Sequence, residues 1–159
     1  MNATLLSLTG AGALGAGLVG GIFFAFSVFV MRALASLPPA QGIAAMQRIN
    51  VTVLHPLFLG PFLGSAPLLG VAAFLAFGGA SPLAAQALTA AFVVYALGSV
   101  GVTIVCNVPR NERLKPMAAD SAEAQAYWPV YVREWLRWNH VRTVASLLAS
   151  ALCTLAVAA

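Results

Sequence analysis

The chain has 159 residues, of which 61% are hydrophobic and only 8% are charged, and its mean hydropathy is +0.92. A soluble globular domain carries about a quarter charged residues, so this chain could not cover itself with polar surface. The composition excludes an ordinary cytosolic enzyme, a disordered segment and a nucleic-acid-binding module. The net charge of +4 is better explained by the Lys and Arg that orient membrane proteins than by a nucleic-acid partner. The lipid bilayer is therefore the first partner that we expect.

Four apolar segments are each long enough for a helix that crosses a hydrocarbon core, which needs roughly 20 residues. They cover residues 5–30, 51–77, 83–106 and 141–158. No Asp, Glu, Lys or Arg occurs in the first three segments, and the fourth has only Arg142, near its start. We expect an all-α protein, an integral membrane four-helix bundle that forms one transmembrane domain over the whole chain.

The charged residues gather in two stretches of the chain. Arg32 and Arg48 flank the connection after the first segment, and the others lie between Arg110 and Arg142. In a chain with four spans these two connections share one side of the membrane, and both termini share the other. Because cytoplasmic segments are enriched in Lys and Arg, we predict cytoplasmic charged connections and external termini, in the inner (plasma) membrane of the cell.

Local signals define the ends of the predicted helices. The two prolines at 38–39 are expected to end the first helix, and residues 41–50 have the pattern of a short amphipathic helix at the membrane interface. Pro109 and Pro116 are expected to break the chain after the third span, because proline disrupts a helix interior. The last helix is expected to begin near Ser121 as a cytoplasmic extension of the fourth span, with a kink at Pro129.

Glycines and prolines mark the first two spans. Glycines at positions 12, 15, 17, 20 and 21 allow close helix approach, and the same surface could join two copies of the chain in a homo-oligomer. In the second span Pro56, Pro61 and Pro67 predict a helix that kinks or opens. The structural explanation is a bent packing helix. The functional alternative is a pathway beside it, as in a small transporter or assembly partner.

Polar side chains recur at every fourth position of the third span, at Tyr95, Ser99, Thr103, Asn107 and Asn111. Steps of four drift slowly around one broad face of an α-helix. Hydrogen bonds between helices explain Ser99 and Thr103 well. Asn107 and Asn111 lie at the expected cytoplasmic mouth of the bundle.

The fourth span begins with an unusual polar group. Asn139, His140 and Arg142 enter the apolar boundary together, close to Trp135 and Trp138. An aromatic belt with a snorkelling arginine is the structural explanation of the Trp and Arg residues. Ionisable groups inside a membrane are by default a functional hypothesis, so this group is a candidate site.

Two histidines open membrane spans at the same depth, His55 on the second and His140 on the fourth. A lone histidine is usually a hydrogen-bonded structural residue. Two histidines on facing helices could instead bind haem or, with further ligands, a metal. A haem- or metal-binding redox protein is therefore the alternative to a site without a cofactor.

Four motifs and Met31 carry a family resemblance. The motifs are FFAFS at 23–27, MQRIN at 46–50, NVPRN at 107–111 and WLRWNHVRT at 135–143. Together they are spread over nearly the whole chain, and the chain resembles the anthrone oxygenase family of small membrane proteins. The resemblance implies four membrane helices and the oxidation of an anthrone to an anthraquinone with no added cofactor or metal. It also implies a common site that contains Asn50, Asn107, Asn111, Trp135, Trp138, Asn139 and Arg142.

The chemistry of such a site follows from the substrate. Removal of a proton from the acidic methylene of an anthrone gives an electron-rich enolate that can reduce oxygen directly. A protein must then supply an apolar slot, a base and donors for the enolate oxygen. We expect His140 or His55 to accept the proton, and Asn139 and Arg142 to stabilise the oxyanion.

The remaining candidates are expected to bind the substrate. Trp135 and Trp138 could face its rings, and Tyr95 joins the asparagines of the implied site. The expected ligand is an apolar aromatic small molecule.

Overall fold

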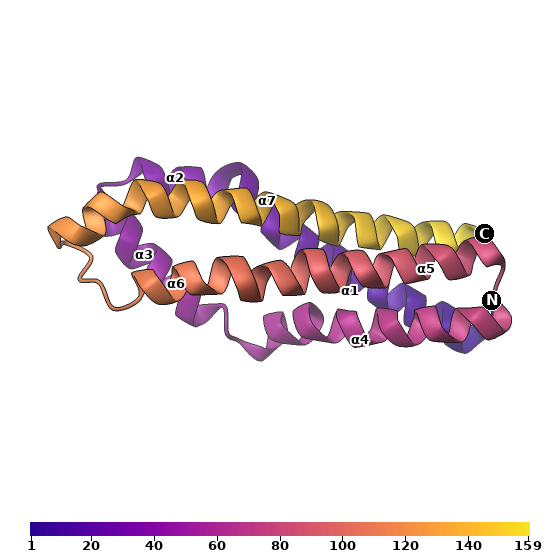
Figure 1. Ribbon diagram of the computed structural model, residues 1–159. Helices are drawn as coiled ribbons and strands as arrows, with labels where there is room; N and C mark the ends of the chain where they lie inside the picture. Colours follow the sequence, from indigo (N-terminus) through magenta and orange to yellow (C-terminus); the bar gives the residue numbers. More distant parts are fainter.

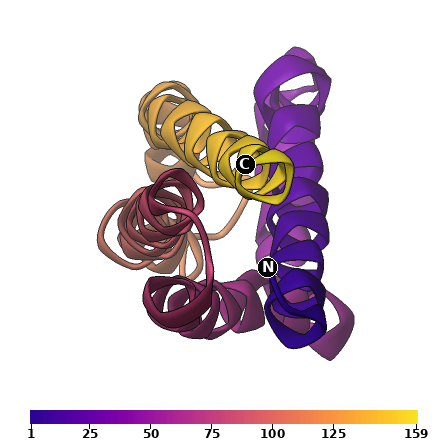
Figure 2. The same ribbon diagram turned by 90° about the vertical axis from the view of Figure 1, so that its right-hand side faces the viewer.

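The computed structural model of the protein describes all residues, 1–159, and it consists of helices without a β-strand. Four helical spans are long and apolar enough to cross a membrane, and they cover Ala3–Ser36, Pro56–Gly79, Pro82–Leu114 and Ala122–Ala158. Each span packs against two others, so that the first lies between the second and the fourth, and the third lies opposite it (Figure 2). The predicted all-α four-helix membrane bundle is confirmed.

Two of the spans are built from several helical segments. The first span comprises α1 (Ala3–Ala25), the π-helical segment η1 (Phe26–Val30) and α2 (Met31–Ser36), and the interfacial helix α3 (Pro39–Thr52) follows it. The second span is α4 (Pro56–Gly79). The third comprises α5 (Pro82–Tyr95), the π-helical segments η2 (Ala96–Gly101) and η3 (Thr103–Asn107), and α6 (Val108–Leu114); the fourth is α7 (Ala122–Ala158).

The two ends of the bundle differ in character. Both termini and the short α4–α5 turn lie at one end, which we call the terminal end (Figure 1). The α2–α3 connection, α3 and the α6–α7 connection lie at the other, which we call the charged end. The two charged stretches of the sequence therefore share one end of the bundle, as the order of the spans predicts.

Four prolines lie where the helical spans continue: Pro61 and Pro67 in α4, Pro109 in the third span and Pro129 in α7. Pro109 is the second residue of α6, and the third span runs on to Leu114 and ends just before Pro116, so the predicted break at Pro109 was wrong. The physical reason is that proline fits the first turn of an α-helix, and the π-helical segment η3 makes a new α-helix begin at Val108. Pro129 lies inside α7, which is uninterrupted and begins after Ser121 as expected.

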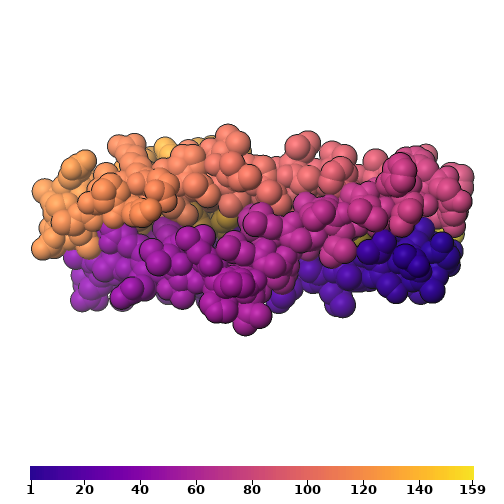
Figure 3. Space-filling view, turned by 90° about the horizontal axis from the view of Figure 1, so that it is seen from below, coloured from indigo at the N-terminus to yellow at the C-terminus, as the bar shows by residue number.

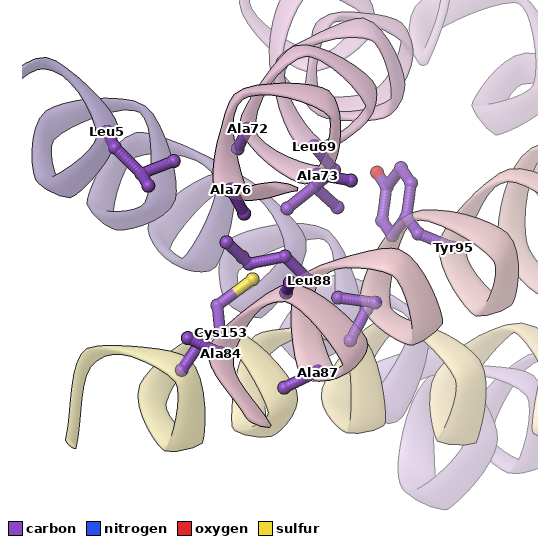
Figure 4. Packing of buried hydrophobic residues seen from close by; sticks show 14 of the residues in the cluster. Leu5, Leu69, Ala72, Ala73, Ala76, Ala84, Ala87, Leu88, Tyr95 and Cys153 are labelled. Atoms are coloured by element: carbon purple, nitrogen blue, oxygen red, sulfur yellow. The ribbon is translucent and has the colours of Figure 1, made fainter. Parts of the chain in front are cut away.

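Small side chains bring the spans close together at the terminal end. The cluster in Figure 4 is rich in alanine, and its members include Leu5, Leu69, Ala72, Ala76, Leu88 and Cys153. A Cβ atom on Gly12 would lie 2.6 Å from Leu69 Cδ2, and one on Gly20 would lie 2.8 Å from Leu147 Cδ2. These glycines therefore serve packing within the chain, and a homo-oligomer through the first span stays a prediction.

Larger side chains fill the charged end. Trp128, Tyr131 and Trp135 of α7 pack there with methionines of α2 and α3. Gln47 ties α3 to the end of the third span, because its Nε2 donates to the carbonyls of Leu114 and Met117 at 2.9 and 2.8 Å. The interfacial helix therefore closes the charged end of the bundle and leaves a space between itself and the membrane spans.

Candidate functional site

A cavity of about 300 Å³ lies inside the charged half of the bundle. All four spans and α3 contribute to its walls, which are mostly apolar. The aromatic lining residues are Phe23, Phe26, Phe58, Phe62 and Trp135, and the polar ones are Gln47, Asn50, Thr103, Asn107, Asn111, Glu112, Lys115 and Arg142. Small-molecule pockets begin at about 300 Å³, so the space suits one compact aromatic ligand.

Arg142 is the only buried residue of the protein with a charged side chain, and it is 5% exposed. Its guanidinium donates to Thr103 Oγ1 at 3.1 Å and to Asn139 Oδ1 at 2.7 Å. Neither ion pair of the protein involves it, and its Nε has no hydrogen-bond partner. Arg142 is therefore a buried cation with no carboxylate beside it.

Two aromatic rings support this cation. The guanidinium carbon lies 4.2 Å from the ring centroid of Phe23 and 5.0 Å from that of Trp135. Ring faces attract cations electrostatically, more strongly where water is excluded. They hold the arginine in place without neutralising it, so the positive charge stays available to an anionic or electron-rich oxygen.

Asn139 contacts the guanidinium of Arg142 and fixes its position. The side-chain Nδ2 of Asn139 donates to the Phe23 carbonyl and to Ser27 Oγ, both at 2.8 Å. Because a carbonyl only accepts hydrogen bonds, this contact orients the amide with Oδ1 toward the guanidinium. Ser27 in turn lies 3.0 Å from Thr143 Oγ1, whose hydroxyl donates to the Asn139 carbonyl. The chain of hydrogen bonds therefore joins the first span to the fourth at the arginine.

A second group of hydrogen bonds holds the aromatic wall of the cavity. Asn111 Oδ1 accepts from the Tyr131 hydroxyl at 2.9 Å and from Trp135 Nε1 at 3.0 Å. Asn50 Nδ2 lies 3.4 Å from the same tyrosine oxygen. Both donors to Asn111 face its Oδ1, so its Nδ2 is left free for a ligand.

Asn107 adds an unsatisfied acceptor to the cavity wall. It is 1% exposed, and its Nδ2 donates to the Trp135 carbonyl at 3.2 Å. Its Oδ1 is buried and has no partner. Since buried polar atoms are almost always hydrogen-bonded, this oxygen and the unpartnered Nε of Arg142 each leave room for a bond to a polar ligand group or a water molecule.

The π-helical segments occur beside this site. Thr103 and Asn107 are the first and last residues of η3, and Ser27 belongs to η1. A π-helical turn is wider than an α-helical one, and such turns are frequent at functional sites. In a π-helical turn a step of four residues falls short of a full turn, whereas in an α-helix it exceeds one. The two drifts offset each other along the third span. The polar row of the third span therefore stays directed into the bundle instead of drifting around the helix.

Half of the predicted site residues line the cavity, namely Asn50, Asn107, Asn111, Trp135 and Arg142. Asn139 is fully buried and touches Arg142 rather than the cavity. Tyr95 lies deeper in the bundle, where its hydroxyl donates to the Phe62 carbonyl at 3.0 Å.

Trp138 and both histidines lie outside the cavity. Trp138 and His140 are exposed, because the face of α7 that carries Asn139 and Arg142 points inward and these two positions point away from it. His55 is also exposed, and its Nδ1 accepts the backbone N–H of Leu57 at 3.2 Å, which caps α4. No group of three or more His, Cys, Asp or Glu side chains lies close enough to hold a metal ion.

The sequence did not single out several residues that the structure places at the site. In the sequence, Phe23 and Phe62 cannot be distinguished from the other apolar residues of a membrane span. Ser27 and Thr143 are small polar residues of a kind that is common in membrane helices. They did not stand out, although both belong to the motifs that carry the family resemblance. Glu112 of α6 contributes to the cavity wall, but in the sequence it belongs to a charged stretch, where such residues are common.

The protein is thus a small membrane protein with an internal binding cavity. Its membrane spans surround an apolar space, and one buried cation lies in the wall of that space. A model of one family, described as anthrone oxygenase, matches residues 57–152. This match covers more than half of the chain, so the protein belongs to the anthrone oxygenase family. No curated protein and no solved structure matches the chain.

Proposed function

We propose that the protein is an oxygenase that binds an anthrone-like aromatic in the cavity and stabilises its enolate with Arg142. One observation carries this proposal, the buried guanidinium without a carboxylate partner in the wall of an apolar cavity. The membership in the anthrone oxygenase family supports it. A substrate that develops negative charge on one oxygen is the partner that this arrangement suits.

In the first step the substrate loses a proton. The methylene C–H bond breaks, its electron pair moves into the ring system, and the carbonyl oxygen becomes the enolate oxygen. Arg142 donates to this oxygen, and Trp135 and Phe23 face the rings. Glu112 is the only Asp, Glu or His among the lining residues, and its carboxylate pairs with Lys115 at the rim of the cavity. We assign proton acceptance to this carboxylate, through a water molecule.

In the second step the enolate reduces oxygen. The enolate carbon gives electrons to O₂, a C–O bond forms, and one proton completes a hydroperoxide. The remaining hydrogen on that carbon then leaves as a proton, its electron pair forms the new C=O bond, and the O–O bond breaks with loss of water. Each anthrone therefore consumes one O₂ and gives one anthraquinone and one water, with electrons supplied by the substrate and no added cofactor.

Oxygen uptake with anthrone, measured on the protein in lipid nanodiscs and corrected for the rate in empty nanodiscs, tests this function. We expect Arg142→Gln to lower the rate by about a hundredfold, as the loss of one donor to a developing oxyanion does. Arg133→Gln is the matched control, because Arg133 is an exposed arginine on the same helix. Equal rates for the wild type and Arg142→Gln, with both proteins folded, would contradict the proposal.

A further inference from the structure

The cavity has an opening on one side of the bundle. The second span packs on α5 and on the beginning of η2, but no comparable packing joins it to η3 or α6. Seen from this side, α7 is visible at the bottom of a hollow between the α3–α4 region and the third span (Figure 3). The second and third spans therefore separate toward the charged end and expose the interior laterally.

Apolar residues surround this opening. Val51 and Leu54 precede α4 and are 57% and 64% exposed, and Ile104 and Val108 of the third span are 60% and 41% exposed. All of them also line the cavity. Each residue thus faces the cavity on one side and the surroundings of the bundle on the other. Ile104 and Val108 lie on a membrane span, where exposed apolar side chains face lipid.

The charged lining residues lie next to this apolar border, toward the charged end. Glu112, one turn after Val108 on α6, pairs at 3.2 Å with Lys115, the residue that follows this helix. The cavity therefore has an apolar wall that borders the hydrocarbon and a charged rim that borders the membrane surface. An apolar ligand that dissolves in the bilayer meets the apolar wall first.

We propose that the ligand reaches Arg142 from within the bilayer, through this lateral opening between the start of α4 and η3. The substrates are therefore aromatics dissolved in the membrane, including ones that carry an aliphatic chain. The rings and the oxygen lie inside, against Phe23 and Arg142, and the chain extends between Leu54 and Ile104 into the lipid. This inference rests on the proposed function for the binding site, and it adds the route and the tolerance of a chain.

Bulky side chains at the opening test the route. Ile104→Trp and Leu54→Trp narrow the opening, whereas Val105→Trp and Leu57→Trp place the same ring on neighbouring exposed positions, 72% and 81% exposed, that do not line the cavity. A hydroxyanthraquinone with an alkyl chain serves as the probe, because it cannot be oxidised in the proposed reaction. Its visible absorbance reports binding to the protein in nanodiscs and is not disturbed by added tryptophan.

We expect both variants at the opening to slow association at least tenfold and both controls to bind at the rate of the wild type. Wild-type association rates for Ile104→Trp and Leu54→Trp, equal slowing in the controls, or no binding to the wild type would overturn the lateral route. Oxygen uptake in the same nanodiscs reports on the proposed function separately. If the variants at the opening slow binding but the wild type does not oxidise anthrone, the proposed oxygenase function is wrong and the lateral route still holds.

Discussion

Burial of the Arg142 guanidinium has a large cost in solvation free energy. An ion that leaves water loses several kcal/mol of solvation unless partners compensate it, and here the partners are two neutral oxygens and two ring faces. A carboxylate at the position of Asn139 would compensate the charge better. The sequence instead has an amide there, which holds the cation without neutralising it, as a site for an anionic ligand requires.

Ser27 is the residue that tests this positioning. Its hydroxyl accepts from Asn139 and contacts Thr143, and it does not line the cavity. Ser27→Ala should lower the turnover of anthrone about two- to tenfold, since one neutral hydrogen bond contributes about 0.5–1.5 kcal/mol. Ser36→Ala, an exposed serine on the same span that bonds only to the Ala33 carbonyl, is the control. A loss of turnover in both variants, or in neither, would argue against the network.

The histidines provide a second test at this scale. The sequence favoured His55 or His140 as the base, but both are exposed outside the cavity. The geometry predicts that His55→Ala and His140→Ala keep most of the oxygen uptake, whereas Glu112→Gln reduces it. Rates measured across these three variants decide between the two assignments, and a large loss in either histidine variant would restore that histidine as the base.

The elements fit together because small residues let the spans approach at defined points. A Cβ atom on Gly98 of η2 would lie 2.6 Å from the Cβ of Ala145 on α7, whereas one on Gly64 of α4 would meet nothing within 4 Å. Both are membrane-embedded glycines, so they differ mainly in the contact that a methyl group would make.

Gly98→Ala should therefore destabilise the protein by about 1–3 kcal/mol, the usual cost of overpacking a well-filled interior. Gly64→Ala should leave the stability unchanged or slightly higher, because alanine favours helix more than glycine does. Unfolding in mixed micelles measures both variants. Equal stabilities would show that the third and fourth spans are not packed as described.

The membrane spans could be predicted from the sequence, but the π-helical segments within them could not. Hydrophobic length predicts each span, because a membrane helix must satisfy its backbone internally and stay apolar over its length. The π-helical segments are not predictable in this way, since the apolar pattern of η3 is that of an α-helix. The spacing of four from Tyr95 to Asn111 does not reveal these segments, because it also fits one broad face of an α-helix.

At the scale of the whole molecule, the candidate site could be predicted in part. Asn107, Asn139 and Arg142 are polar residues in an apolar setting, and this contrast alone marks them in the sequence. The sequence could not tell which side of α7 faces inward near its start, because aromatic and polar residues occur all around the helix there. This is why Trp138 and His140 were grouped with residues that the structure separates from them.

The orientation in the membrane is a prediction for the complete bundle. The charged end carries the two charged stretches, so we expect it to face the cytoplasm and both termini to face outside. Alkaline phosphatase fused after Ala159 should be active, because this enzyme works only outside the cytoplasm. Green fluorescent protein fused at the same position should be dark, because it does not become fluorescent when it is exported unfolded. An inactive phosphatase together with a fluorescent fusion would reverse the proposed topology.

The most direct measurement of the central claim is an experimental structure of the protein in nanodiscs with a bound hydroxyanthraquinone. We predict a ligand oxygen at about 3 Å from a guanidinium nitrogen of Arg142, a normal hydrogen-bond distance, with the rings in the apolar part of the cavity beside Phe23. A ligand held elsewhere, for example beside His55 or His140, with the cavity around Arg142 empty, would contradict it.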